Sequence, residues 1–266
     1  MTLNVAVSGA TGRMGREVAR LVAQADDLQL VGGIARSSYE PRDTIPLGYD
    51  QVEAPETAGP VIEAADVVLD FSSPEQLTRL LTSQAEALAG RALVVGTTGL
   101  GAEHFGALER AAERSPIVAA ANFSIGVNVL IALVERAARL LSADRYDVEV
   151  VEAHHRRKLD APSGTALSLG AAVARGRDAR LEDVRRDGRT GRSEVERPVG
   201  EIGFHAVRGG DVAGEHRVMF LGARERLELA HAALDRSLFA EGALVAARWV
   251  VRQPPGRYGL LQVLGF

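Results

Sequence analysis

Two adjacent histidines and a nearby lysine form the part of the sequence best suited to acid–base chemistry. All five side chains of residues 154–158 are basic, beginning with His154 and His155 and ending with Lys158, although the whole chain is acidic. Histidine exchanges protons near neutral pH, and a neighbouring lysine can hold a carboxylate or assist the transfer. The segment therefore predicts proton transfer on a small carboxylate. The ordinary alternative for such a basic run is a solvated surface.

A predicted helix begins directly after this segment, at residues 162–165, which read Pro-Ser-Gly-Thr. The first N–H groups of a helix lack partners within it, and its positive dipole end attracts anions. We therefore expect the helix start and the cations to form one anion-binding pocket. No metal is expected, because no third histidine or carboxylate lies at ligand spacing and the nearby cations repel a metal ion. The remaining histidines are interpreted as structural: His104, His205, His216 and His231.

Three glycines at three-residue spacing, Gly9, Gly12 and Gly15, lie where the first predicted strand leads into the first predicted helix. Glycine allows a tight turn and a close approach of the backbone to a ligand, and the helix N-terminus offers N–H groups to a pyrophosphate. This placement predicts a dinucleotide site, with the Arg13 guanidinium beside the phosphates. The alternative is a tight strand–helix turn that binds nothing.

The end of the second predicted strand indicates which dinucleotide is bound. An acidic residue there accepts a hydrogen bond from the ribose 2′-hydroxyl of NAD, whereas an arginine suits the 2′-phosphate of NADP. Here the strand ends in Ala35 and Arg36. We therefore expect NADPH to be preferred over NADH. A surface arginine without a ligand is the alternative.

Loops rich in small and hydroxylated residues follow three further predicted strands, at residues 70–73, 96–99 and 120–124. In an open parallel sheet the ligand lies across the carboxyl ends of the strands. Each loop alone is typical of ordinary turns, but their shared position at successive strand ends favours contact with the cofactor.

The elements that must hold these residues alternate in type through the first half of the chain. Apolar strands are predicted at residues 4–9, 28–35, 66–71, 92–96 and 117–121, with helices between several of them. The clearest helix is predicted to begin at Ser73, followed by Pro74 and by Gln76 as a capping-box partner, and to end at Gly90. This alternation of strands and helices predicts a parallel sheet covered on both faces.

The pattern changes after Asn122, which predicts a second domain. Its helices are expected at residues 127–141 and 163–175, and its strands at residues 146–153, 201–208, 216–221 and 226–231, in a mainly antiparallel sheet. Residues 177–197 are polar and arginine-rich and are expected to form a mobile loop. A last helix is predicted at residues 237–251.

Composition excludes several other classes of protein. The 266 residues include 31 Lys and Arg against 35 Asp and Glu, so a broad nucleic-acid or anionic-membrane surface is not expected. The chain has no cysteine, which excludes disulfides and thiolate chemistry. No apolar run approaches the ~20 residues of a membrane span, and the N-terminus lacks a signal-peptide pattern, so a cytoplasmic globular protein is expected.

With these motifs in view, the chain resembles the dihydrodipicolinate reductase (4-hydroxy-tetrahydrodipicolinate reductase) family nearly from end to end. The resemblance is carried by residues 9–15, 70–72, 96–99, 121–124, 152–167 and 208–216. It implies an α/β fold, with a Rossmann-like dinucleotide-binding domain of residues 1–124 completed by residues 236–266. Residues 125–235 would form an α+β domain that binds substrate and builds a homotetramer. It also implies NAD(P)H-dependent reduction of a small dicarboxylate in the diaminopimelate route to lysine.

The resemblance assigns roles residue by residue. His154 and Lys158 would be catalytic, and His155, Gly164 and Thr165 would bind substrate. The residues that would bind cofactor are Gly9, Ala10, Thr11, Gly12, Arg13, Met14, Arg36, Gly96, Thr97, Thr98, Ala120, Ala121, Asn122 and Phe123. The chain departs from the family at Ala35, where many members have an acidic residue, and in the tail at residues 256–264, which is looser than the usual pattern.

Two other interpretations fit part of the sequence. A regulator that binds NADP(H) without turnover would need the same glycine-rich turn, but it leaves residues 154–165 unexplained. A dehydrogenase of another small carboxylic acid would use both segments, since a fold does not fix a substrate.

Overall fold

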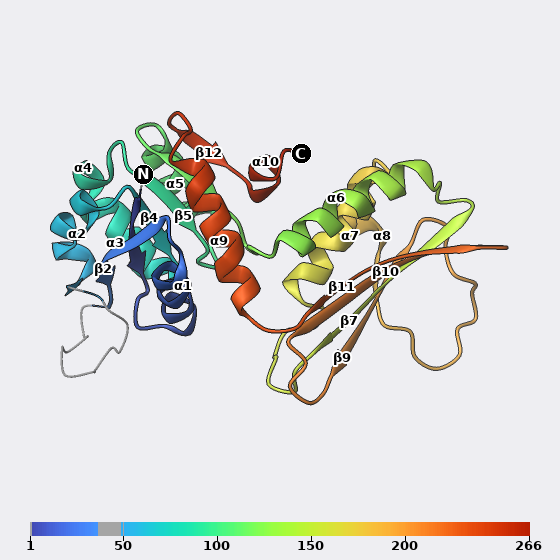
Figure 1. Ribbon diagram of the computed structural model, residues 1–266. Helices are drawn as coiled ribbons and strands as arrows, with labels where there is room; N and C mark the ends of the chain where they lie inside the picture. Colours follow the sequence, from blue (N-terminus) through green and yellow to red (C-terminus); the bar gives the residue numbers. More distant parts are fainter. Residues whose placement is uncertain (1, 37–48, 50) are drawn as a thin grey trace. The chain divides into compact units, whose positions relative to one another are not determined.

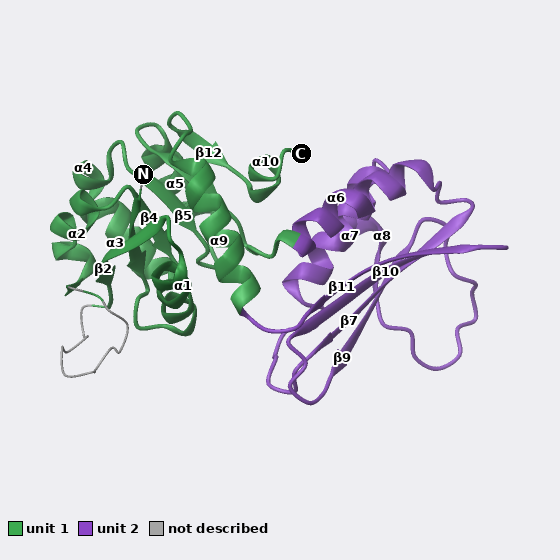
Figure 2. Cartoon of the chain, in the orientation of Figure 1, with its two compact units in different colours: residues 1–125, 237–266 green, residues 126–236 purple. Residues whose placement is uncertain are grey.

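The computed structural model describes residues 2–36, 49 and 51–266, and the chain divides into two compact units (Figure 2). Unit 1 consists of Met1–Ile125 and Ser237–Phe266, and unit 2 consists of Gly126–Arg236. Each unit has its own sheet and its own apolar core.

A parallel seven-stranded sheet in the order β12-β6-β5-β4-β1-β2-β3 forms the centre of unit 1 (Figure 1). Its strands are β1 (Leu3–Ser8), β2 (Leu28–Ile34), β3 (Val52–Glu53), β4 (Val67–Asp70), β5 (Ala92–Val95), β6 (Pro116–Ala119) and β12 (Gly256–Tyr258). The strand order reverses at β1, which has β2 on one side and β4 on the other. In such sheets the ligand crevice lies at the carboxyl ends of the strands near this reversal.

Helices cover both faces of this sheet, because its strands are apolar on both sides. The helices of unit 1 are α1 (Arg13–Gln24), η1 (Pro55–Thr57), α2 (Gly59–Ala64), α3 (Pro74–Ser83), α4 (Ala85–Leu88), α5 (Ala102–Ala112), α9 (Ser237–Val250) and α10 (Leu260–Val263). Val5 and Val7 of β1 belong to the core that packs against α1 and α9, whereas Ala6 lies in the core that packs against α2, α3 and α5.

The helix predicted to begin at Ser73 does so, but it is interrupted before its predicted end at Gly90. The Ser73 hydroxyl accepts the Gln76 N–H at 3.3 Å, which caps α3 as expected. The Gln76 side chain does not complete a capping box and instead donates to the Ser8 hydroxyl at 3.5 Å. At Gln84 the backbone leaves the helical region, with φ −117° and ψ 25°, which separates α3 from α4.

The divergent C-terminal tail packs onto unit 1. Strand β12 pairs with β6, and Leu260 of α10 is buried in the same core as α1 and α9. The rings of Trp249 and Tyr258 meet edge to face, with centroids 5.1 Å apart.

Unit 2 is a five-stranded sheet in the order β11-β10-β7-β9-β8, with its helices on one face (Figures 1 and 2). Its elements are α6 (Ile125–Leu140), β7 (Tyr146–His154), α7 (Gly164–Gly176), α8 (Leu181–Val184), β8 (Arg185–Asp187), β9 (Ile202–Arg208), β10 (Gly214–Gly222) and β11 (Arg226–Ala233). β10 pairs antiparallel with β7 and β11, whereas β9 runs parallel to β7 and β8. The parallel sheet of unit 1 and this second, α+β unit confirm the predicted fold class.

The arginine-rich stretch expected to be a mobile loop instead contains α8 and the edge strand β8. Arg189 and Arg197, which follow β8 in the same stretch, pair with the carboxylate of Glu149 on β7 at 2.9 and 3.2 Å. Its polar composition therefore reflects ion pairs rather than a lack of structure.

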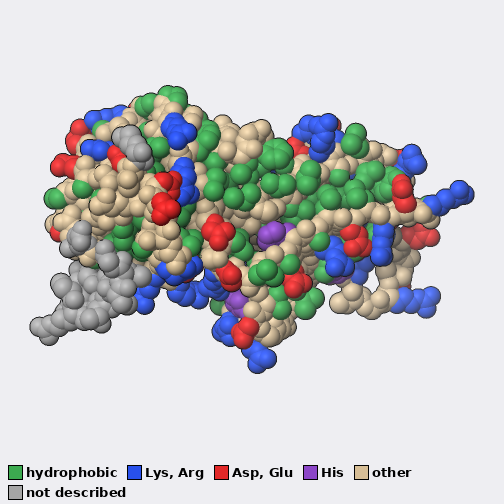
Figure 3. Space-filling view, viewed as in Figure 1, with side chains coloured by type: hydrophobic (Ala, Val, Ile, Leu, Met, Phe, Trp, Pro, Cys, Tyr) green, Lys and Arg blue, Asp and Glu red, His purple; other side chains and the backbone are tan. Residues whose placement is uncertain are grey.

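No helix in the described part of the chain is long and apolar enough to cross a membrane. On the face shown in Figure 3, acidic and basic side chains are interspersed over both units.

Candidate active site

The turn after β1 has the geometry expected of a phosphate-binding turn. Gly9 has φ +77°, and a Cβ there would lie 2.4 Å from the Phe71 carbonyl oxygen. A Cβ at Gly15 would lie 2.2 Å from the Gly9 carbonyl oxygen. Glycine is therefore required at both positions. Gly12 is the N-cap of α1 and has no side chain to cap it, which leaves the first N–H groups of that helix to a ligand.

The loops after β4, β5 and β6 are joined to one another and to this turn. The Ser72 N–H donates to the Thr97 hydroxyl at 2.9 Å, and the rings of Phe71 and Phe123 meet edge to face with centroids 5.9 Å apart. A Cβ at Gly96 would lie 2.2 Å from the Phe71 ring. Four of the strand ends that the sequence singled out therefore meet in one place.

Asp70 is fully buried under these loops, and no role of its own was assigned to it from the sequence, although it lies in the loop of residues 70–73. The hydroxyls of Ser72 and Thr97 donate to its carboxylate at 2.7 and 2.5 Å. Burial raises the pKa of Asp70. This buried carboxyl group therefore links the loop after β4 to the loop after β5.

A cavity of about 280 Å³ lies at the ends of β5 and β6. Its lining includes four of the predicted cofactor residues: Thr97, Thr98, Ala120 and Ala121. Asn122 uses its side-chain oxygen to accept the Ser124 N–H at 2.8 Å, which fixes the turn that follows. Arg13 and Arg36 are exposed, at the start of α1 and just beyond β2.

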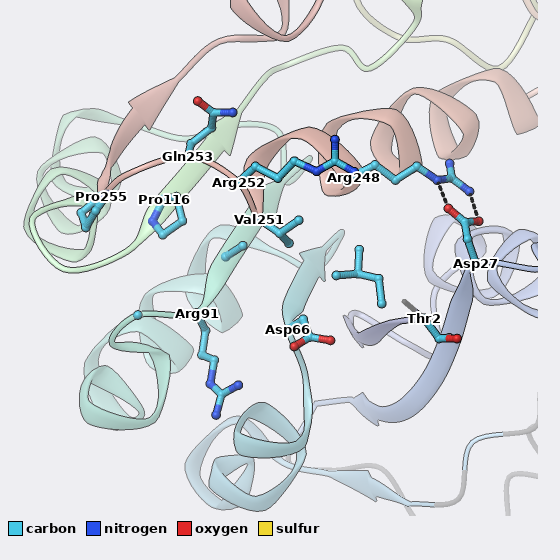
Figure 4. Close-up of a pocket in the computed structure, with 13 residues that line it drawn as sticks. Thr2, Asp27, Asp66, Arg91, Pro116, Arg248, Val251, Arg252, Gln253 and Pro255 are labelled. Carbon is cyan, nitrogen blue, oxygen red and sulfur yellow. Dashed lines mark hydrogen bonds and ion pairs between the residues drawn. The ribbon is translucent and has the colours of Figure 1, made fainter.

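A second cavity, of about 500 Å³, lies at the opposite end of the strands of the same sheet, beside the amino ends of β1 and β5 (Figure 4). Arg248 of α9 lies on its wall and holds Asp27 through two hydrogen bonds of 2.7 Å. None of the predicted site residues lines this cavity.

In unit 2, His154 is the last residue of β7 and is nearly buried. Alternate residues of a strand face the same side, so His154 shares a face with Glu152. The His154 Nδ1 atom lies 2.6 Å from a carboxylate oxygen of Glu152. Glu152 also accepts hydrogen bonds from the Arg208 guanidinium, at 2.6 and 2.7 Å, and from the Ser163 N–H, at 3.1 Å.

Glu152 is ionised at neutral pH. Burial alone would raise the pKa of this carboxyl group, but the hydrogen bonds from Arg208, His154 and Ser163 outweigh burial and lower it. The sequence did not identify Glu152 or Arg208 as functional, although both lie within the motifs quoted above.

His216, interpreted from the sequence as structural, packs directly against His154. Their rings meet edge to face with centroids 5.2 Å apart, and His216 Nε2 lies 3.2 Å from the Ser163 hydroxyl. Burial lowers the pKa of His216 to about 4, so its ring is neutral at pH 7. Of the other three histidines, His104 accepts the Gly101 N–H, His205 contacts Glu149, and His231 on β11 lies opposite His216 in the sheet.

The rest of the basic segment lies beside His154. Lys158 pairs with Asp160 at 2.9 Å and is 22% exposed. Burial lowers the pKa of His155, and its Nδ1 atom is buried without a hydrogen-bond partner among the described residues. Arg208 donates to the Asp160 carbonyl oxygen at 2.6 Å, which ties the segment to β9.

The start of α7 is open beside this segment. The Ser163 hydroxyl caps the helix by accepting the Ala166 N–H at 3.2 Å. Gly164 and Thr165 are its first two residues, and a Cβ at Gly164 would meet no atom within 4 Å. Among the described residues, no cluster of three His, Asp or Glu side chains is arranged to hold a metal ion.

Comparisons with known proteins show the family to which the chain belongs. A family model described as dihydrodipicolinate reductase, N-terminus, matches residues 3–123, and one described as dihydrodipicolinate reductase, C-terminus, matches residues 126–264. A protein of Caulobacter vibrioides named 4-hydroxy-tetrahydrodipicolinate reductase is 45% identical over 99% of this chain and 98% of its own. One of the same name from Anaeromyxobacter sp. is 47% identical over the same shares.

A solved structure shows the same fold. The dipicolinate-bound dihydrodipicolinate reductase from Paenisporosarcina sp. TG-14 superposes with a TM-score of 0.75 over 97% of this chain and 98% of that one, at 24% identity. Given the family models and the relatives above, this chain belongs to the dihydrodipicolinate reductase family and is an NAD(P)H-dependent oxidoreductase.

Proposed function

We propose that this protein reduces 4-hydroxy-tetrahydrodipicolinate to tetrahydrodipicolinate in the diaminopimelate route to lysine, with NADPH preferred over NADH. The proposal is carried by the open start of α7 beside His154, His155 and Lys158, in a chain whose other unit has a glycine-rich turn before an uncapped helix. Two facts support the substrate. Relatives named 4-hydroxy-tetrahydrodipicolinate reductase match nearly the whole chain. The solved relative is bound to dipicolinate, a dicarboxylate.

The residues of unit 1 fit a nicotinamide dinucleotide. The glycines of the first turn let its backbone pack tightly against itself and against the loop after β4, and the start of α1 directly after this turn has no side-chain cap. Gly9, Ala10, Thr11, Gly12, Arg13 and Met14 would hold the pyrophosphate, and Arg36 a 2′-phosphate. Gly96, Thr97, Thr98, Ala120, Ala121, Asn122 and Phe123 would hold the ribose and the nicotinamide.

The residues of unit 2 would bind the substrate and transfer a proton to it. When bound, the reduced nicotinamide supplies the hydride. The overall reaction also consumes one proton and releases water, so the protein must move a proton near neutral pH. His154 would transfer it, with Lys158 as the second proton-transfer group. His155, Gly164, Thr165 and the Lys158 ammonium would hold the two carboxylates.

We also propose that the protein is a cytoplasmic homotetramer assembled through unit 2. Support for assembly comes from the helices of unit 2, which cover one face of its sheet and leave the other without a helix (Figure 2). Light scattering after size exclusion should give a mass four times that of one chain. A monomer at micromolar concentration would contradict the tetramer.

A coupled assay tests the reaction itself. The substrate is generated in situ, and the absorbance of NADPH or NADH is followed, with the substrate-generating enzyme omitted as the control. We expect substrate-dependent oxidation, faster with NADPH. Failure to oxidise either cofactor with fresh substrate would overturn the proposal and favour a protein that binds NADP(H) without turnover.

A further inference from the structure

Glu152 occupies the point where the acid–base residue and the substrate helix meet. Its side chain is 1% exposed, and each carboxylate oxygen has two partners. One oxygen meets His154 Nδ1 and an Arg208 nitrogen, and the other meets the Ser163 N–H and the second Arg208 nitrogen. A carboxylate accepts about four hydrogen bonds, so every acceptor site of Glu152 is used.

We propose that Glu152 is a positioning residue that fixes the tautomer and orientation of His154 and anchors the substrate helix to it. This inference rests on the proposed function, in which His154 transfers the proton. An ionised carboxylate only accepts hydrogen bonds, so the Glu152 oxygen 2.6 Å from Nδ1 requires a proton on that nitrogen. Proton exchange with substrate then falls to Nε2.

The surroundings of His154 Nε2 agree with these separate roles, in which Nδ1 binds Glu152 and Nε2 exchanges the proton. Among the described residues, His154 Nε2 makes no hydrogen bond. A Cβ at Gly214 would lie 3.1 Å from Nε2, so the glycine at the start of β10 keeps a side chain away from that atom. The neutral ring of His216 supports the other side of the imidazole without adding a second positive charge.

The same carboxylate reaches the anion-binding end of α7. Ser163, whose N–H it accepts, caps the helix that begins with Gly164 and Thr165. Arg208 completes the arrangement, because it binds Glu152 and also the carbonyl of Asp160, the partner of Lys158. Glu152 therefore connects His154, the start of α7 and, through Arg208, the segment that contains Lys158. Its buried charge is satisfied by these same hydrogen bonds.

The chain contains a matched control on the same strand. Glu149 lies on β7 three residues earlier, on the opposite face, and is 9% exposed. It is bound by two arginines and a histidine, Arg189, Arg197 and His205, as Glu152 is bound by one arginine and a histidine. None of its partners is a candidate catalytic or substrate residue. Glu149→Gln therefore measures what the loss of a buried ionic group away from His154 does to the fold and to assembly.

The test is a double-mutant cycle in the coupled assay on the full-length protein. We expect Glu152→Gln to lower kcat about 100-fold and to raise KM by less than about 10-fold, because proton transfer is disturbed more than binding. Glu149→Gln should leave kcat within about three-fold of the wild type. In a His154→Gln background, Glu152→Gln should lower kcat by less than about three-fold more, because residues that act as a unit are not additive. Equal falls in both backgrounds would overturn the proposal.

A second measurement keeps the inference separate from the proposed reaction. In protein labelled with ¹⁵N-histidine, His154 should show a protonated Nδ1, and Glu152→Gln should reduce that population without substrate present. If the His154 tautomer is unchanged in Glu152→Gln, the positioning role is overturned, even if the wild type turns over the substrate as proposed. Absence of turnover in the wild type with the expected tautomer would instead reject the proposed function alone.

Circular dichroism establishes that each variant is folded. If Glu152→Gln does not fold, Glu152→Asp replaces it in the same cycle, because it keeps the charge but draws the carboxylate back from Nδ1 by one methylene. Its kcat should lie between those of the wild type and His154→Gln. A wild-type kcat in Glu152→Asp with an unchanged tautomer would also overturn the proposal.

Discussion

Ionisation of buried side chains determines what unit 2 can do at neutral pH. Glu152 has a lowered pKa and is an anion, whereas burial keeps the neighbouring His216 neutral. Lys158 is paired with Asp160, whose own pKa is lowered by that hydrogen bond. A proton on His154 therefore faces one directly bonded negative charge, and the adjacent imidazole adds no opposing positive charge.

The role of His154 is tested by replacing it with a side chain of similar polarity that does not titrate. His154→Gln should lower kcat by about 10²–10⁴-fold with a smaller change in KM, because proton transfer is lost while most of the binding contacts remain. Steady-state kinetics and a separate titration with NADPH measure the two effects, and cofactor binding should be unchanged because His154 lies outside unit 1. A kcat near that of the wild type in a folded variant would remove His154 from the mechanism.

At this scale we expect cofactor choice to depend on Arg36. It follows Ala35, which stands directly after β2 in place of a carboxylate, and it is exposed beyond the same end of the sheet as the glycine turn. A charge-assisted phosphate contact contributes roughly 1.5–3 kcal/mol, or about 10- to 150-fold in kcat/KM. Arg36→Ala should therefore lose most of the advantage of NADPH over NADH. Assays with both cofactors measure it, and an equal loss with each would reject the assignment.

At the scale of elements, the strands with continuous apolar runs were predictable from sequence, and so was the start of α3 at Ser73. The two-residue strand β3 and the polar edge strand β8 were not, because backbone pairing at a sheet edge needs no apolar pattern. Residue types also do not show that β9 runs parallel to β7.

The buried polar residues of the site were missed for a related reason. Asp70 is held by Thr97, 27 residues away, and Glu152 by Arg208, 56 residues away. A carboxylate at the end of an apolar strand looks like a solvated turn residue until the fold brings its partner to it. His216 was missed in the same way, because its contact with His154 depends on the register of β10 against β7.

The packing of β10 against β7 and α7 predicts a specific dependence of stability on pH. The pKa of His216 is about 4 in the folded protein, against about 6.5 in an unfolded chain. Between these values the unfolded state binds the proton and the folded state does not, so His216 favours folding fully above pH 6.5 and less as the pH falls toward 4. From pH 7.5 to 5.0 this lowers the free energy of unfolding by roughly 2 kcal/mol.

Urea denaturation at the two pH values checks this. His216→Gln keeps a group that can bond the Ser163 hydroxyl but removes the titration, so its loss of stability on acidification should be smaller than that of the wild type by this amount. Protein concentration is held constant, because assembly also affects the measured stability. An equal decline in both proteins would contradict the neutral, buried state of His216.

At the scale of the whole molecule, the two sets of candidate residues belong to different units. All the cofactor candidates lie in unit 1, and all the acid–base and substrate candidates lie in unit 2. The chain passes between the units twice, at Ile125–Gly126 in the first turn of α6 and at Arg236–Ser237 where α9 begins. Residues at the ends of elements can absorb backbone rotations without disturbing a core, and hinges commonly lie there.

Hydride transfer requires the nicotinamide and the substrate to be in contact, and we expect the two units to close over both ligands and exclude water. We therefore expect a hinge at the two crossings and a smaller radius of gyration when NADP⁺ and dipicolinate are both bound. Small-angle scattering measures it, with each ligand alone as a control and calorimetry to establish that both sites are filled. Light scattering on the same samples must show an unchanged oligomer, because assembly would also alter the profile. An unchanged radius with both ligands bound would mean that the units do not move together, and that the two sites meet without closure.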